Sequence, residues 1–273
     1  MSLDPRPSQR LSDEALSSRV ERERLAHSDR DVLSESYRLK DRFSHIWHFP
    51  SRKRFFALID EHLQNIAGKT VLDYGCGRGQ ASLKYLGRGA VVHGIDISPE
   101  YIEDAARSAR RAGYSEEQFH FAVMDAHTLE FDDDTFDLVV GFGILHHLDA
   151  EAALREIHRV LKPGGRVLLQ EPLADNPLLK LFRLLTPHAR TEDEAPFTGR
   201  DVDRLSDDRH WQIELAYCGL IEAPLAMVTS VIAPNRPDNW LLRWADYLER
   251  WTHDQGILLA WNQYVLFNMM KKG

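Results

Sequence analysis

The chain has 273 residues, of which 43% are hydrophobic and 28% are charged, and its formal net charge is −8. This length and composition are typical of one enlarged globular domain rather than two separate ones. The acidic balance, without a long stripe of Lys and Arg, argues against a nucleic-acid substrate.

Cysteine usage and apolar runs exclude further classes. Cys76 and Cys218 give neither a disulfide framework nor a metal-ligand spacing, so we expect no metal site. No run of about 18 apolar residues occurs, so we expect no membrane span. The polar N-terminus lacks the apolar core of a secretion signal. The remaining expectation is a cytoplasmic enzyme.

The first 50 residues are expected to form an N-terminal helical arm, ahead of a domain at residues 51–273. Residues 12–14, Ser-Asp-Glu, predict the start of a helix. Aromatic side chains then crowd residues 37–49. Two interpretations of this stretch stay open: an amphipathic helix packed on the domain, or a lid that closes over bound ligands.

The pattern around residues 70–80 organises the rest of the chain. A short apolar run stops at Asp73, and glycines follow at every second position, Gly75, Gly77 and Gly79. The pattern predicts a buried parallel strand, a tight turn and the start of a helix. Glycine is needed where the backbone takes positive φ or where a ligand lies against the main chain. The helix N-terminus beyond the turn offers unpaired N–H groups.

Two cofactor classes use such a turn. A dinucleotide site has a third glycine at the position that Gln80 occupies here, and its pyrophosphate would be repelled by Asp73. An NAD-linked oxidoreductase is therefore disfavoured. A ligand with a cationic amino group, such as S-adenosylmethionine, would suit Asp73. Taken alone, the turn is also compatible with no ligand at all.

Further acidic residues end the next predicted strands. Asp96 ends the strand at residues 91–96, and a carboxylate about 20 residues past the glycine turn pairs with ribose hydroxyls. Asp125 follows the next apolar run, where it could accept the amine of adenine. Strands alternate with helices up to Glu171, which predicts a parallel sheet whose ligands bind at the carboxyl ends of its strands.

Five motifs together resemble the class I S-adenosylmethionine-dependent methyltransferases of the small-molecule type: VLDYGCGRGQ, GIDIS, MDAHTLEF, FDLVVGFGILHHL and LKPGGRVLLQEPL. They cover roughly residues 68–172. The resemblance implies a Rossmann-like α/β fold with a seven-stranded, mostly parallel sheet and an antiparallel edge strand. It also implies S-adenosylmethionine as cofactor, with S-adenosylhomocysteine as product. The implied cofactor-binding residues are Asp73, Gly75, Cys76, Gly77, Asp96, Ile97, Asp125, Ala126 and Gly141, although Cys76 is most simply a small packing residue.

The last hundred residues follow the family pattern less closely. We predict strands at residues 211–218 and 261–270, the second of them antiparallel, and a helical insertion at about 220–255 between them. Trp240, Trp244 and Trp251 recur in this insertion at helical spacing. They would either pack on the domain or a second copy, giving a possible homodimer, or form an apolar wall for a substrate.

Three residues are candidates for a general base, which helps when a hydroxyl or carbon must lose a proton. His146 and His147 follow the fourth strand, and adjacent helical residues diverge, so at most one would point into the pocket. Glu171, at the end of the fifth strand, is the third candidate. Each also has a structural interpretation: packing against the cofactor for the histidines, and capping of Asn176 or the next helix for Glu171. His188, Arg190, Asp193 and Glu194 form a further polar cluster, either solvated or substrate-binding.

The residues after the fourth strand narrow the substrate class. Gly-Phe-Gly-Ile stands at residues 141–144, where methyltransferases acting on nucleobases or glutamine carry an acidic-or-Asn-Pro-Pro-aromatic motif. We therefore predict methylation of a small, partly hydrophobic metabolite, preferentially at oxygen. The alternative is carbon methylation of an aromatic or isoprenoid-like substrate. A binding module that holds S-adenosylmethionine without catalysis is a further alternative.

Overall fold

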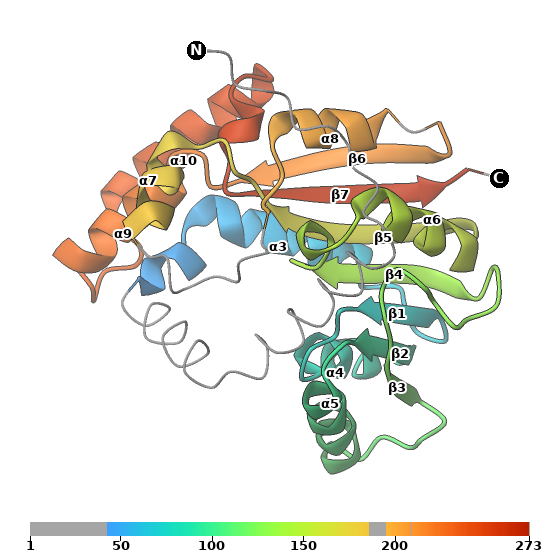
Figure 1. Cartoon of the computed structure of the whole chain (residues 1–273). Coiled ribbons are helices and arrows are strands. Elements are labelled where there is room, and N and C mark those ends of the chain that lie inside the picture. The colour runs from blue at the N-terminus through green and yellow to red at the C-terminus, as the bar shows by residue number, and fades with distance from the viewer. Residues whose placement is uncertain (1–42, 186–194, 208, 273) are drawn as a thin grey trace.

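The computed structural model describes residues 43–185, 195–207 and 209–272 (Figure 1). Three expectations fall outside these residues: the helix beginning at residues 12–14, most of the N-terminal arm, and the polar cluster of His188, Arg190, Asp193 and Glu194. None of the described helices is long and apolar enough to cross a membrane.

A seven-stranded sheet in the order β3-β2-β1-β4-β5-β7-β6 forms the centre of the fold. The strands are β1 (Thr70–Tyr74), β2 (Val91–Asp96), β3 (Phe119–Val123), β4 (Phe136–Phe142), β5 (Leu161–Pro172), β6 (Trp211–Cys218) and β7 (Tyr264–Lys271). The first five in this order pair in parallel, and β7 is antiparallel to both β5 and β6. The predicted fold class is confirmed. The last strand begins later than predicted because Trp261 lies in a 3-10 turn, η4 (Leu259–Trp261).

Helices cover both faces of the sheet (Figure 1). Buried residues of α3 (Pro50–His62), α4 (Gln80–Leu86) and α5 (Pro99–Arg111) pack in one cluster, and those of α6 (Ala150–Val160) and α8 (Gly199–Ser206) pack in another. Two of these helices have side-chain caps: the side chains of Ser98 and Thr198 accept hydrogen bonds from the first turns of α5 and α8. Helix α3 begins at Pro50, because proline suits the first helical position.

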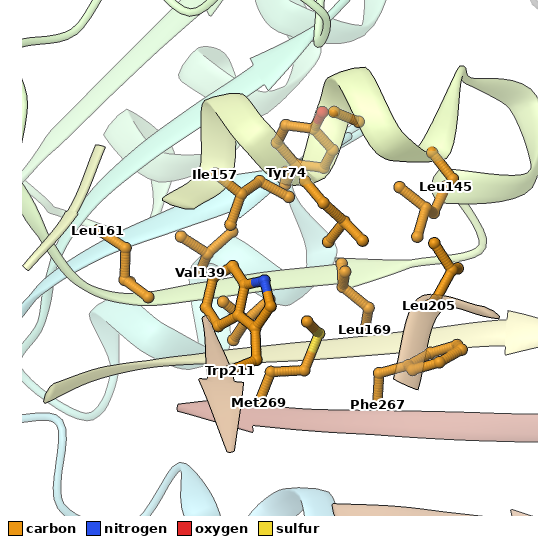
Figure 2. Packing of buried hydrophobic residues seen from close by; sticks show 14 of the residues in the cluster. Tyr74, Val139, Leu145, Ile157, Leu161, Leu169, Leu205, Trp211, Phe267 and Met269 are labelled. Atoms are coloured by element: carbon orange, nitrogen blue, oxygen red, sulfur yellow. The ribbon is translucent and has the colours of Figure 1, made fainter. Parts of the chain in front are cut away.

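The larger hydrophobic cluster fixes α6 on the sheet. Figure 2 shows Ile157 of α6 above Val139 and Leu169 of the central strands, with Trp211 and Met269 closing the cluster. All five side chains are almost completely buried. This packing positions the turn between β4 and α6, which carries the two candidate histidines, His146 and His147.

The predicted insertion between β6 and β7 is confirmed, but it contains two helices, α9 (Glu222–Ile232) and α10 (Trp240–Asp254), rather than one. Pro234 and Pro237 separate them, since proline interrupts a helix. Cys218 at the end of β6 and Pro172 at the end of β5 both pair with Tyr264. The insertion therefore leaves the sheet at the edge where the parallel strands end.

Buried polar contacts attach the insertion to the N-terminal part of the domain. Glu222 accepts a hydrogen bond of 2.7 Å from the backbone N–H of Ser51 at the start of α3. His45, in the 3-10 turn η1 (Ser44–Trp47), contacts the hydroxyl of Thr229 and the carbonyl of Pro234 through its two ring nitrogens. Residues 43–49 therefore pack on α9.

The tryptophans of α10 lie on the surface of the described chain. Trp240, Trp244 and Trp251 are 68%, 53% and 53% exposed. They line neither of the two cavities that meet at the strand ends. The expectation that they form the wall of a substrate pocket is therefore not met.

Two buried carboxyl groups make stability depend on pH. Burial raises the pKa of Asp73 to about 7 and the pKa of Glu222 to about 8. In the unfolded chain both groups ionise near pH 4. Between about pH 4 and pH 8 the folded state therefore binds more protons than the unfolded state, and the free energy of unfolding falls as pH rises, levelling off above this window.

Each group contributes up to about 1.4 kcal/mol per pH unit inside its own window. Urea unfolding between about pH 5 and pH 9 should show this fall in the wild type and a shallower fall in Glu222→Gln, because glutamine stays neutral. Identical slopes in the two proteins would contradict the assignment for Glu222.

Candidate active site

A cavity of about 220 Å³ lies at the carboxyl ends of β1, β2 and β4. In the strand order, β1 is the point from which the chain extends in opposite directions, and open α/β sheets bind ligands at such a switch point. The lining residues come from the strand ends and the turns that follow them: Gly75, Gly77, Ile95, Asp96, Ile97, Tyr101, Met124, Asp125, Ala126, Phe142, Gly143, Ile144, His147 and Leu148.

The three glycines of the first turn have different structural roles. A Cβ atom on Gly75 would lie 2.9 Å from the side chain of Ile144, and one on Gly79 would lie 2.8 Å from Cβ of Ala105. These two positions therefore allow close packing. Gly77 has φ of +51° and nothing within 4 Å of such an atom. Its open face borders the cavity, so a ligand can lie against the main chain there.

Asp96 is held rigidly in the cavity wall. One carboxylate oxygen accepts from the backbone N–H of Gly77 and the other from that of Ser98, each at 2.9 Å. Tyr101 completes this side of the cavity, with the Arg78 guanidinium 4.5 Å from its ring centre. Because a carboxylate has about four acceptor positions, these two N–H groups do not use the whole acceptor capacity of Asp96.

Asp125 is held by His127, a residue that the sequence interpretation missed. Asp125 accepts from the backbone N–H of His127 at 2.9 Å and from ring Nδ1 at 2.8 Å. The ring Nε2 accepts from the N–H of Asp149, which leaves the proton on Nδ1. The side-chain hydrogen bond from His127 is the main cause that lowers the pKa of Asp125. A histidine two positions after a strand-end acid is the signal that could have identified it.

Three predicted cofactor-binding residues do not line this cavity. Asp73 is 2% exposed and accepts from the Ser82 hydroxyl at 2.5 Å, so its carboxylate faces α4. A Cβ atom on Gly141 would lie 2.8 Å from Leu169, which shows that the strand is covered there. The thiol of Cys76 lies 3.0 Å from the corresponding position on Gly94 and packs against β2. The packing interpretation of Cys76 therefore agrees with the structure.

A second, wider cavity of about 1040 Å³ adjoins the first. The two share Phe142 and Gly143. Side chains of α3, α4, β5 and β7 line it, and so does His146. The 3-10 turn η2 (Leu145–His147) thus directs its two histidines differently: His147 lines the first cavity and His146 the second.

Glu171 reaches neither cavity and holds the η2 turn instead. Its carboxylate is fully buried and accepts from the backbone N–H groups of Ile144, Leu145 and His146. It also contacts Nδ1 of His146 at 2.7 Å. The expected cap on Asn176 or the following helix is wrong, because the side chain turns back toward the end of β4.

The residues of the first cavity fit S-adenosylmethionine, the cofactor that the sequence resemblance implies. Asp96 offers acceptors for the two ribose hydroxyls, and Asp125 offers one for the adenine amine. Met124 and Leu148 supply apolar surface for a purine, and Gly77 leaves its backbone open. The second cavity provides space for an acceptor molecule beside the first.

Substitution of Gly77 tests this fit. We expect Gly77→Ala to raise the dissociation constant of S-adenosylhomocysteine at least about 10-fold in calorimetry, because the new methyl group would occupy ligand space. Gly164→Ala is the matched control: its φ is +73°, nothing lies within 4 Å, and it does not line the cavity. Both variants carry a similar backbone strain of roughly 1–2 kcal/mol. Equal affinities for the two variants would contradict the placement.

Comparison with known proteins agrees with this geometry. A family profile described as "Methyltransferase domain" matches residues 72–169. Aklanonic acid methyltransferase DauC of Streptomyces sp. (strain C5) is 38% identical over 40% of this chain and 50% of its own. The 2-phytyl-1,4-naphtoquinone methyltransferase of Nostoc punctiforme is 33% identical over 55% of this chain and 70% of its own. The chain spans about half the length of several other curated relatives.

Among solved structures, geranyl diphosphate C-methyltransferase from Streptomyces coelicolor A3(2), in complex with Mg²⁺, geranyl diphosphate and S-adenosyl-L-homocysteine, superposes with a TM-score of 0.56. It is 18% identical, and the match covers 80% of this chain and 81% of that one. At this identity the likeness shows the fold. Because the match at 33% identity covers 70% of the Nostoc protein, the chain belongs to the class I S-adenosylmethionine-dependent methyltransferase family.

Proposed function

We propose that the protein transfers a methyl group from S-adenosylmethionine to a hydroxyl oxygen of a small, partly hydrophobic molecule, with His146 as general base. The observation that carries the proposal is the buried His146–Glu171 pair at the junction of two cavities. The first cavity fits the cofactor and the second has room for the acceptor. Holding two reactants in contact contributes much of the rate enhancement in such a displacement.

Glu171 acts as a positioning residue. As it already accepts three backbone N–H groups, its carboxylate serves as an acceptor, and Nδ1 of His146 donates to it. The basic nitrogen of His146 is then Nε2. The ring lies beside Gly143, one of the two residues shared by both cavities, with its Cε1 3.6 Å from where a Cβ atom of Gly143 would be.

When bound, S-adenosylmethionine supplies a sulfonium methyl group, whose bond to sulfur breaks as the bond to the acceptor oxygen forms, leaving neutral S-adenosylhomocysteine. His146 Nε2 takes the proton that the acceptor hydroxyl loses and passes it to water. His147 packs against His146 with ring centres 4.1 Å apart and forms part of the cofactor wall. Of the two histidines, His146 is therefore our candidate base.

Carbon methylation is the second candidate. It is favoured by the similarity to a Nostoc protein named for a naphthoquinone substrate. In that reaction His146 would take the proton lost from carbon. A binding module without catalysis is disfavoured, because such a module has no need of a second cavity beside the cofactor.

Isotope labelling separates these candidates. The protein is incubated with S-adenosylmethionine carrying a ¹³C-methyl group and with two panels of acceptors, hydroxynaphthalenes and naphthohydroquinones, the reduced form of naphthoquinones in which the ring carbon is nucleophilic. The carbon NMR spectrum of the product distinguishes a methyl ether from a methyl on carbon. A labelled ether supports the proposal, and a carbon-bound label supports the second candidate. Turnover of neither panel, with tight cofactor binding intact, would favour the binding module.

A further inference from the structure

An arginine in the second cavity forms no ion pair with any described residue. Arg52, in the first turn of α3, is 3% exposed and lines the second cavity. Its Nε and Nη1 atoms are buried and make no hydrogen bond. The guanidinium carbon lies 4.4 Å from the ring centre of Trp47, 4.9 Å from Tyr264 and 5.1 Å from Phe56. Three aromatic rings thus hold the cation in place.

Carboxylates lie close by in this region, yet none in the described chain forms an ion pair with Arg52. Two residues further along α3, Arg54 pairs with Asp246, which also pairs with Arg250. Burying an unpaired charge is strongly unfavourable, whereas a buried charge that meets an opposite charge is stabilised. The absence of an acidic partner for Arg52 among the described residues therefore points to a bound anion.

The rest of the cavity agrees with an anionic ligand. Lys53 and Lys84 also line it, and the one acidic lining residue among the described positions, Asp60, pairs with Arg88. Gln170, 7% exposed, presents a buried side-chain oxygen that accepts no hydrogen bond. The cavity thus combines positive charge, aromatic surface and an acceptor for a hydroxyl group.

We infer that the second cavity is an anion-binding subsite in which Arg52 binds a carboxylate or phosphate group of the methyl acceptor. The acceptor is then an aromatic or isoprenoid-like molecule with a hydroxyl group near His146 and an anionic group at Arg52. A guanidinium suits both anions, because it offers two parallel N–H donors to a pair of oxygens. The inference rests on the proposed function for the identity of this cavity as the acceptor site.

Calorimetry tests the anion-binding role of Arg52 without requiring catalysis. 2-Naphthoate, 2-naphthyl phosphate and neutral 2-naphthol are titrated into the protein saturated with S-adenosylhomocysteine. We expect at least one anion to bind the wild type about 100-fold more tightly than 2-naphthol, and this preference to vanish in Arg52→Met. The matched control Arg54→Met should keep it. The stronger of the two anions identifies carboxylate or phosphate as the recognised group.

Equal binding of the anions and 2-naphthol, or an anion preference that survives in Arg52→Met, would overturn the inference. Thermal unfolding of the ligand-free protein adds a second readout. Because Arg52→Met removes an uncompensated buried charge, we expect the Tm of this variant to equal or exceed that of the wild type. A sharp fall in Tm would mean that Arg52 has a structural role, and would also overturn the inference. The proposed function fails separately, if His146→Ala still transfers methyl groups at the wild-type rate while anion binding is intact.

Discussion

His146→Ala is expected to lower kcat for methyl transfer by about 10²–10⁴-fold, the range typical of a general base, while the dissociation constant of S-adenosylmethionine changes little. His146 lines the second cavity and not the first, where we place the cofactor, so its removal should affect the chemical step rather than cofactor binding. Single-turnover kinetics with saturating cofactor, alongside calorimetry, separates the two quantities.

A series of phenolic acceptors distinguishes a base from a structural residue. An acidic phenol is already ionised in solution and needs no base, so the loss in His146→Ala should shrink as the acceptor becomes more acidic. A purely structural defect would slow all acceptors alike. His120→Ala, at an exposed position of β3, is the matched control and should behave as wild type. A uniform loss across the series would contradict the assignment of His146 as base.

Asp96→Ala is expected to raise the dissociation constant of S-adenosylmethionine by about 10²-fold or more. Hydrogen bonds to a charged group contribute roughly 1.5–3 kcal/mol each, and two ribose hydroxyls would lose their acceptor. The exposed carboxylate Glu103, on the adjacent helix α5, provides the matched control, and Glu103→Ala should bind as wild type. Calorimetry measures both affinities.

Asp96 also accepts the N–H groups of Gly77 and Ser98, so its loss could loosen the turn. Asp96→Asn separates loss of the ligand contact from loosening of the turn, because the amide keeps one acceptor oxygen for the backbone but carries no charge. Because one of the two backbone N–H groups loses its acceptor, we expect both the Tm and the affinity to lie between those of Asp96→Ala and the wild type. Wild-type affinity in Asp96→Ala would exclude Asp96 from the cofactor site.

Local sequence patterns were sufficient to predict the sheet, and six of the nine residues expected at the cofactor site line the first cavity. The glycine turn and the acids at Asp96 and Asp125 each follow directly from a strand, so their position at one edge needs only a parallel sheet. The strand at Trp211–Cys218 was predicted to the residue. The glycine turn, the strand-end acids and the bounds of this strand are determined by residues close together in the sequence, so the sequence pattern predicts them.

Contacts between distant segments could not be predicted in this way. Glu171 lies at a strand end like Asp96, yet it turns back to hold residues 25 to 27 positions earlier in the chain. Asp73 faces Ser82 rather than the cavity. Arg52 enters the second cavity because α3 packs beside β7 and Tyr264, an arrangement with no local signature. Of the second cavity, which we propose as the acceptor site, the sequence therefore predicted His146 but not Arg52.

A crystal structure of the protein with S-adenosylhomocysteine bound tests the central claim most directly, namely that the cavity at the ends of β1, β2 and β4 holds the cofactor. The ribose should lie at Asp96, the adenine at Asp125 and Leu148, and the sulfur atom near Gly143, facing the cavity that contains His146 and Arg52. Density for the ligand at any other place on the protein, with this cavity empty, would contradict the account.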